Sequence, residues 1–161
     1  MWSKARAISR KDEVSDFETL GLVRDGSVDW LTFNRPGRLN AFNPSMVGEL
    51  LDYFEGMRSR PETRIIVIRG SGRAFCAGAD IKDFLGSIAK GGEADFEVQR
   101  KVSGIVFAMR RCPQPIIALV HGAATGGGFS LALAADIRIA GLSARMNCAF
   151  IKLGLTGADM G

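Results

Sequence analysis

The chain has 161 residues, of which 47% are hydrophobic and 24% charged, and its formal net charge is +4. This size suits one domain with a sizeable buried core, and the dispersed positive charge disfavours a nucleic-acid-binding protein while suiting a small anionic ligand. Its three cysteines are spaced neither as zinc ligands nor as a disulfide framework, and no apolar run has the length of a membrane span. We therefore expect a cytoplasmic protein with no membrane partner and no metal site.

The N-terminal part of the chain divides into two regions. Residues 1–16 mix basic residues, serines and acidic residues, and we expect a disordered N-terminal lead there, followed by a folded core over residues 17–161. Residues 19–24 and 27–33 predict a β-hairpin, because the Asp-Gly pair between them is a strong turn signal. The core therefore begins with two paired strands.

A helix and a buried strand follow the hairpin. Asn43 is typical of a helix N-cap and Pro44 of the first helical position, and apolar residues then recur at helical spacing before Pro61. Residues 65–68 are a continuous run of isoleucine and valine, which predicts a strand covered on both faces. Paired strands followed by a helix and a further buried strand are typical of an α/β domain.

The second half of the chain continues the alternation of helices and strands. Asp80 is expected to begin a short helix, and apolar residues at helical spacing predict an amphipathic helix over 98–109. Strands are predicted at 116–120 and 137–140, with a small helix at 129–134 between them. The whole pattern predicts a stacked α/β architecture.

Two glycine-bearing turns are the most informative feature of the sequence. The first spans residues 75–80 and the second residues 121–128, and each follows a predicted strand. We expect the backbone N–H groups of Ala79 and Gly127 to point at one oxygen atom. Two such donors form an oxyanion hole, which stabilises negative charge developing on a carbonyl oxygen. The turns therefore favour an enzyme.

Small residues beside the two donors would allow close approach of a ligand. Gly78 and Gly126 leave room for it, and Gly127 would stand at the N-terminus of the next helix, whose dipole adds to the hydrogen bond. Glycines before a helix are also typical of a tight strand-to-helix turn that binds nothing, and this alternative stays open. A phosphate-binding P-loop is disfavoured, because no lysine follows the glycines.

Five motifs follow one another along the chain: Asn34-Arg35-Pro36, Leu39-Asn40-Ala41, residues 72–81, residues 122–128 and Ala135-Asp136. In this order and spacing they resemble the enoyl-CoA hydratase/isomerase (crotonase) superfamily over about residues 17–161. The resemblance implies a spiral of ββα units that binds acyl-coenzyme A thioesters and stabilises an enolate between Ala79 and Gly127. It also implies no cofactor other than the coenzyme A of the substrate, and a homo-oligomer, either a trimer or a hexamer.

The resemblance also implies where the substrate binds. The backbone around residues 77–81 would line the pocket for the coenzyme A adenine, and the loop at 38–41 would flank the same ligand. Arg38 would either meet a coenzyme phosphate or remain a solvated loop arginine. The substrate-binding residues expected on this basis are Arg38, Leu39, Ala41, Ala77, Gly78, Asp80, Ile81, Gly126, Ser130 and Phe150.

The chain departs from the family it resembles at the catalytic carboxylates. Hydratases of the family use two glutamates, and this chain has Ser130 and Phe150 at the matching positions. An unactivated serine is a poor base at neutral pH, and phenylalanine transfers no proton. Asp159 is the best remaining carboxylate: the resemblance implies it, because some members of the family, such as dienoyl-CoA isomerases, carry a catalytic aspartate close to this point. A carboxylate buried in a carbonyl pocket suits proton transfer. The alternative for Asp159 is a helix-capping or loop role.

Four other side chains of reactive type are expected to be structural. Asp80 suits a cap of its short helix, and Asp136 suits hydrogen bonds to nearby backbone groups. Cys76 has no obvious base beside it and is expected to be a small packed thiol. His121, the only histidine, stands at a strand end, where a structural role is favoured over general-base catalysis.

The sequence leaves more than one hypothesis of function open. The first is an acyl-CoA-processing enzyme that catalyses hydration, double-bond isomerisation or a related lyase or hydrolase step. The alternative is a non-catalytic acyl-CoA binder or an inactive homologue, and a subunit that serves assembly alone is a third. Relatives in the family continue through further helices, so we expect the chain to lack the usual C-terminal helices.

Overall fold

The structure is a computed structural model that describes residues 12–13, 17–83 and 93–150. Its elements are β1 (Asp12–Glu13), β2 (Leu20–Asp25), β3 (Val28–Phe33), η1 (Pro36–Arg38), α1 (Pro44–Gly56), η2 (Met57–Ser59), β4 (Ile65–Gly70), α3 (Glu93–Arg111), β5 (Ile116–Val120), β6 (Ala123–Thr125), α4 (Gly127–Ala134), β7 (Ile137–Ala140) and β8 (Arg145–Asn147). Strands and helices alternate along most of the chain, so the predicted α/β class is confirmed.

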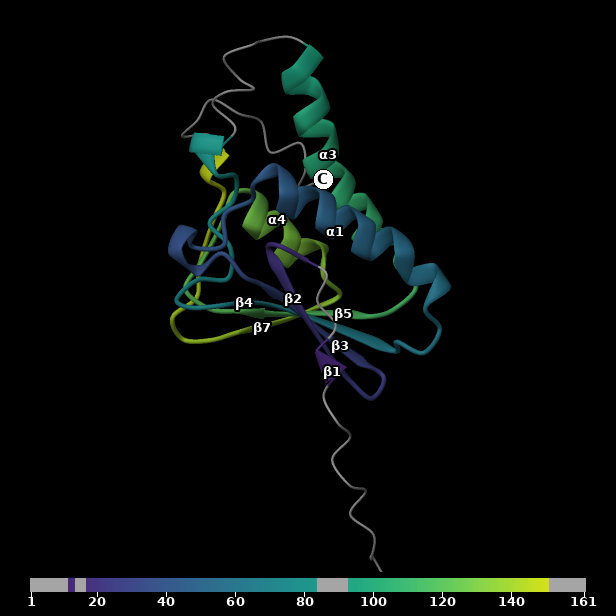
Figure 1. Cartoon of the computed structure of the whole chain (residues 1–161). Coiled ribbons are helices and arrows are strands. Elements are labelled where there is room, and N and C mark those ends of the chain that lie inside the picture. The colour runs from purple at the N-terminus through teal and green to yellow at the C-terminus, as the bar shows by residue number, and fades with distance from the viewer. Residues whose placement is uncertain (1–11, 14–16, 84–92, 151–161) are drawn as a thin grey trace, which may run out of the picture.

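The strands form two sheets. The larger has the order β1-β2-β3-β4-β5-β7, and the smaller pairs β6 with β8 in parallel. Figure 1 shows α1, α3 and α4 on the same side of the larger sheet. After β5 the chain enters β6 and α4, and after β7 it enters β8. From β5 onward, the chain therefore alternates between the larger sheet and the smaller one.

The predicted hairpin is confirmed. Strands β2 and β3 pair antiparallel from Leu20↔Phe33 to Asp25↔Val28, and the turn glycine between them, Gly26, has a φ of 61°. Strand β1 pairs with β2 at the sheet edge, within the segment for which the sequence predicts a disordered lead. The rest of that lead, residues 1–11 and 14–16, lies outside the described residues.

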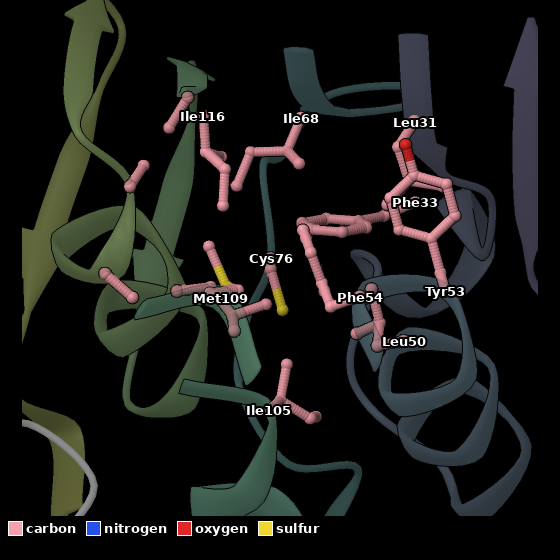
Figure 2. Close-up of a cluster of buried hydrophobic side chains, with 14 of the residues drawn as sticks. Leu31, Phe33, Leu50, Tyr53, Phe54, Ile68, Cys76, Ile105, Met109 and Ile116 are labelled. Carbon is pink, nitrogen blue, oxygen red and sulfur yellow. The ribbon is translucent and has the colours of Figure 1, made fainter. Parts of the chain in front are cut away.

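Helix α1 begins as the sequence predicts. The Asn43 side chain accepts a hydrogen bond of 3.0 Å from the Met46 backbone N–H, and Pro44 holds the first position. The buried face of α1 includes Leu50 and Phe54, which point with β3 residues into one hydrophobic core (Figure 2). The cap and the apolar face together fix where α1 starts and which side meets the sheet.

One buried carboxylate ties the hairpin to α1. Asp29 is fully buried on β3, where the Tyr53 hydroxyl donates to it at 2.9 Å and the Arg24 guanidinium at 3.1 Å. Burial, together with the neighbouring Asp29 carboxylate, raises the pKa of Tyr53 well above its usual range. The phenol therefore remains a hydrogen-bond donor at all physiological pH values.

The later helices and strands agree with the sequence-based predictions in type but not always in length. Residues 81–83 begin a helical turn as predicted, and the continuation of that helix lies outside the described residues. Helix α3 starts at Glu93, five residues before the predicted start. Strands β6 and β8 were not predicted. Both strands have only three residues, and their pairing depends on contacts distant in sequence.

The side of the fold formed by β7 and β8 exposes apolar side chains. Every residue of β7 and β8 is exposed, including Ile137, Ile139 and Met146, and Leu142 between the strands is exposed as well. A group of exposed apolar residues commonly marks a surface that binds another protein. Strand β7 also ends the larger sheet, so one of its backbone edges has no neighbouring strand in the described part of the chain.

We expect Asn43→Ala to lower the free energy of unfolding by about 1 kcal/mol, because the first turn of α1 loses its side-chain acceptor. Thermal unfolding should show a melting temperature lower by about 2–4 °C. Ser45→Ala, in the same first turn, is the matched control and should change stability by less than about 0.5 kcal/mol. Equal melting temperatures for Asn43→Ala and the unchanged chain would contradict the capping role.

Candidate active site between two glycine turns

The two glycine turns run side by side. Cys76 and Ala124 form an isolated parallel bridge, in which the Cys76 N–H donates to the Ala123 carbonyl at 3.0 Å and the Thr125 N–H donates to the Cys76 carbonyl at 3.0 Å. The Thr125 hydroxyl adds a third bond, 2.8 Å, to the Ala77 carbonyl. The first turn is therefore fastened to the second by its main chain.

The register of this bridge brings the two predicted donors to matching positions. Ala79 and Gly127 each follow the bridged pair by three residues. A β-carbon added at Gly78, whose φ is 90°, would lie 2.7 Å from the Thr125 carbonyl oxygen and 3.4 Å from the Gly127 nitrogen. Only glycine at position 78 permits this approach of the two backbones.

A second close approach seats α4 on the first turn. A β-carbon added at Gly128 would lie 2.2 Å from the Cys76 carbonyl oxygen, so the start of the helix rests directly on the main chain of the bridge. Gly127 is the first residue of α4. The N-terminal end of a helix carries unpaired N–H groups and partial positive charge, which favour an anionic oxygen.

Both predicted donors keep their backbone N–H groups available. Among the described residues, neither the Ala79 nor the Gly127 amide donates a backbone hydrogen bond. The residue Ala79 is exposed, whereas Gly127 is buried.

Ser130 and Phe150, the residues where the family has its two glutamates, lie against the second turn. The Ser130 hydroxyl is buried and 3.4 Å from the Gly126 carbonyl oxygen, and the Phe150 ring would be 3.7 Å from a β-carbon at Gly126. The Gly126 N–H itself donates to the Asn147 carbonyl at 3.0 Å. The structure therefore brings Ser130 and Phe150 together beside Gly126.

The loop that precedes α1 lies against the first turn. The Ala77 N–H donates to the Leu39 carbonyl at 3.0 Å, and a parallel bridge joins Phe42 to Ala79. Arg38 is exposed at the end of η1. The loop thus stands next to the first turn.

Asn40 fixes the shape of this loop. Its fully buried side chain accepts from the Arg35 N–H at 2.9 Å and donates to the Ser71 and Ala74 carbonyls, both at 2.8 Å. Leu39 and Asn40 have φ values of 52° and 56°, which turn the chain so that the amide points inward. Asparagine tolerates this left-handed conformation better than most residues.

Arg35 forms ion pairs with two carboxylates at the end of the first turn and just after it. One guanidinium nitrogen lies 3.2 Å from the Asp80 carboxylate, the other 3.2 Å from Asp83, and the guanidinium also donates to the Ala41 carbonyl. The contact with the buried Asp80 is an ion pair without hydrogen-bond geometry. In the described structure the Asp80 side chain is therefore paired with Arg35, whereas the sequence suggested a helix cap.

The remaining reactive-type side chains have structural partners. The Asp136 carboxylate accepts from the Ile116 N–H at 2.8 Å, and a ring nitrogen of His121 lies 2.9 Å from the Gly72 carbonyl oxygen. Cys76 is fully buried with its sulfur in the core (Figure 2). Burial raises the pKa of the Cys76 thiol to about 12, so the thiol stays protonated.

Other parts of the molecule do not add to this site. A groove of about 510 Å³ lies between α1 and α3, lined by Phe54, Phe107 and the arginines at 58, 100 and 111, and none of its lining residues belongs to the predicted site. Across the described ranges, no group of three side chains suits a metal ion, and no helix is long and apolar enough to cross a membrane. Asp159 lies outside the described residues.

Three residues of the site were not assigned a role from the sequence. Arg35 and Asn40 belong to motifs that resemble those of the family, yet their partners at Asp80, Ser71 and Ala74 are distant along the chain. An asparagine in a loop is a turn signal that the sequence shows. Phe42 gives no such signal, because an aromatic residue before a helix N-cap is ordinary.

Comparisons with known proteins show to which family the chain belongs. A profile described as Enoyl-CoA hydratase/isomerase matches residues 24–161. The chain belongs to the enoyl-CoA hydratase/isomerase family. Its structure also resembles that of Pseudomonas aeruginosa AtuE with a TM-score of 0.85 at 38% identity, over 89% of this chain and 55% of that one. The crotonase-like fold is thereby confirmed.

Two curated relatives show the extent of the match. A protein of Rhodobacter capsulatus named "Probable enoyl-CoA hydratase" is 42% identical over 125 residues, covering 78% of this chain and 47% of that protein. The 1,2-epoxyphenylacetyl-CoA isomerase of Escherichia coli is 38% identical over 126 residues, covering 78% of this chain and 48% of that enzyme. The chain thus spans about half the length of the curated relatives it matches.

We expect Cys76 to resist alkylation in the folded protein. With a pKa of about 12, roughly one Cys76 thiol in ten thousand is ionised at pH 8, and burial also blocks the reagent. Iodoacetamide followed by peptide mass spectrometry should modify the exposed Cys148 at least a hundredfold faster, and denaturant should abolish the difference. Equal rates in the folded protein would show that Cys76 is not packed as described.

Proposed function

We propose that the protein processes acyl-CoA thioesters by stabilising a thioester enolate between the backbone N–H groups of Ala79 and Gly127. The observation that supports this most is the main-chain bridge between the two turns, which sets both amides at matching positions. Membership of the enoyl-CoA hydratase/isomerase family supports the choice of an acyl-CoA substrate.

Two donors are favourable because the negative charge appears only as the reaction proceeds. A thioester that loses an α-proton, or gains a nucleophile at the β-carbon, places charge on its carbonyl oxygen. Fixed N–H groups stabilise that oxyanion more than the neutral carbonyl, and each donor typically contributes about 3 kcal/mol to lowering the barrier. The dipole of α4 adds to the donor at Gly127.

The proton requires a separate group. Neither Ser130 nor Phe150, which lie beside the second turn, is a carboxylate, so we propose Asp159 as the group that moves the proton. This favours isomerisation or a related lyase step over simple hydration, because hydration in the family relies on both missing glutamates. The curated relative in Escherichia coli is itself named as an isomerase.

A second candidate function is a non-catalytic acyl-CoA binder. Ser130 is fully buried beside Gly126, and the aromatic ring of Phe150 stands next to the same turn. Both features favour binding of an acyl group over activation of water. We also propose that the protein assembles with further copies of itself, because the β7 and β8 side of the fold exposes a group of apolar side chains.

We expect Ala79→Pro to lower the turnover of enoyl-CoA esters by about 10²–10³-fold, because proline lacks the N–H that would meet the oxyanion. The assay follows the conjugated thioester absorbance over a panel of acyl chain lengths, with calorimetric binding of the same esters in parallel. Ala79→Ser keeps the N–H and is the matched control. Unchanged turnover in a folded Ala79→Pro protein, or no turnover with any ester by the unchanged chain, would contradict the catalytic proposal.

Asp159→Asn separates the two candidate functions. If Asp159 moves the proton, turnover should fall at least a hundredfold while the affinity for acyl-CoA changes little, because the amide has the same shape but is not a base. Asp25→Asn, in the hairpin turn, is the control. Binding without turnover in both the unchanged chain and Asp159→Asn would favour the non-catalytic binder.

A further inference from the structure

We propose that Phe42 is the positioning residue that sets the gap between the two amide donors, an inference that rests on the proposed function. Phe42 meets both turns at the donor positions themselves: its main chain pairs with Ala79, and its ring lies against Gly127. No catalytic contact with the substrate is required of it.

The main chain of Phe42 holds the first donor. The Phe42 N–H donates to the Gly78 carbonyl at 2.8 Å, and the Asp80 N–H donates to the Phe42 carbonyl at 2.8 Å. These two bonds bracket Ala79 and leave its own N–H pointing away from Phe42. A movement of Phe42 therefore carries the Ala79 amide with it.

The ring of Phe42 meets the second donor. A β-carbon added at Gly127 would lie 2.6 Å from Cε2 of the ring and 3.4 Å and 3.5 Å from two further ring atoms. Phe42 is 1% exposed, so the ring has no empty space into which it can retreat. The planar ring thus acts as a fixed spacer between the first turn, which holds Ala79, and the start of α4.

The loop that precedes Phe42 is itself anchored. The Arg35 guanidinium donates to the Ala41 carbonyl, and the buried Asn40 side chain bonds three separate backbone groups. The two residues that precede Phe42 are therefore held in place. A methyl group at position 127 that displaces the ring is therefore expected to shift the Ala79 amide through the two backbone bonds of Phe42.

A size-swap series tests the proposal. We compare the unchanged 161-residue chain with Gly127→Ala, Phe42→Leu and the double variant, measuring kcat and KM for an enoyl-CoA ester and the free energy of unfolding. Gly127→Ala should lower kcat more than tenfold and KM less than threefold, because its methyl group collides with Cε2. Leucine lacks that atom, so the double variant should recover at least fivefold in kcat over Gly127→Ala.

A control and a second measurement keep the test decisive. Phe54→Leu removes a comparable buried ring near the C-terminal end of α1 and should lower stability without lowering kcat. Additive losses in the double variant, or kcat losses that merely follow the unfolded fraction, would overturn the proposal.

Amide NMR separates this proposal from the proposed function. Gly127→Ala should shift the Ala79 ¹⁵N–¹H resonance, and the double variant should return it toward its original position, whether or not the protein turns over any ester. An inactive chain with this pattern overturns catalysis but supports the spacer role of Phe42. An Ala79 resonance that responds to neither substitution overturns the spacer role, even in an active enzyme.

Discussion

The site depends on one constraint, the parallel bridge between Cys76 and Ala124. Three hydrogen bonds close it, and glycines at 78 and 128 let the two backbones approach to distances that a β-carbon would block. Because the bridge is made of main-chain groups, it fixes the register of two turns that are nearly fifty residues apart. The relative position of the two donor amides follows from that register.

Much of the fold could be predicted, because its signals are local. The Asp-Gly pair marks the β2–β3 turn, Asn43 and Pro44 mark the start of α1, and the isoleucine-rich run marks β4. Strands β6 and β8 could not be predicted in the same way. Alanine-rich Ala123–Thr125 has little intrinsic preference for a strand and becomes one by pairing with β8 and Cys76.

In the candidate site, too, features with a local sequence signal could be predicted and features that depend on distant contacts could not. The glycine turns and the positions of Ser130 and Phe150 are readable from residue type and spacing. The ion pair of Arg35 with Asp80, the three bonds of Asn40 and the contact of Phe42 with Gly127 all join segments distant in sequence. Such contacts have no local signature, so residue types alone suggested a cap for Asp80 and no role for Phe42.

The central claim is that two main-chain amides share one thioester oxygen, and a crystal structure with a bound acyl-CoA tests it most directly. The account predicts the thioester carbonyl oxygen about 2.7–3.1 Å from the nitrogens of both Ala79 and Gly127. A fully occupied acyl-CoA whose carbonyl oxygen meets only one of these nitrogens, or neither, would contradict it.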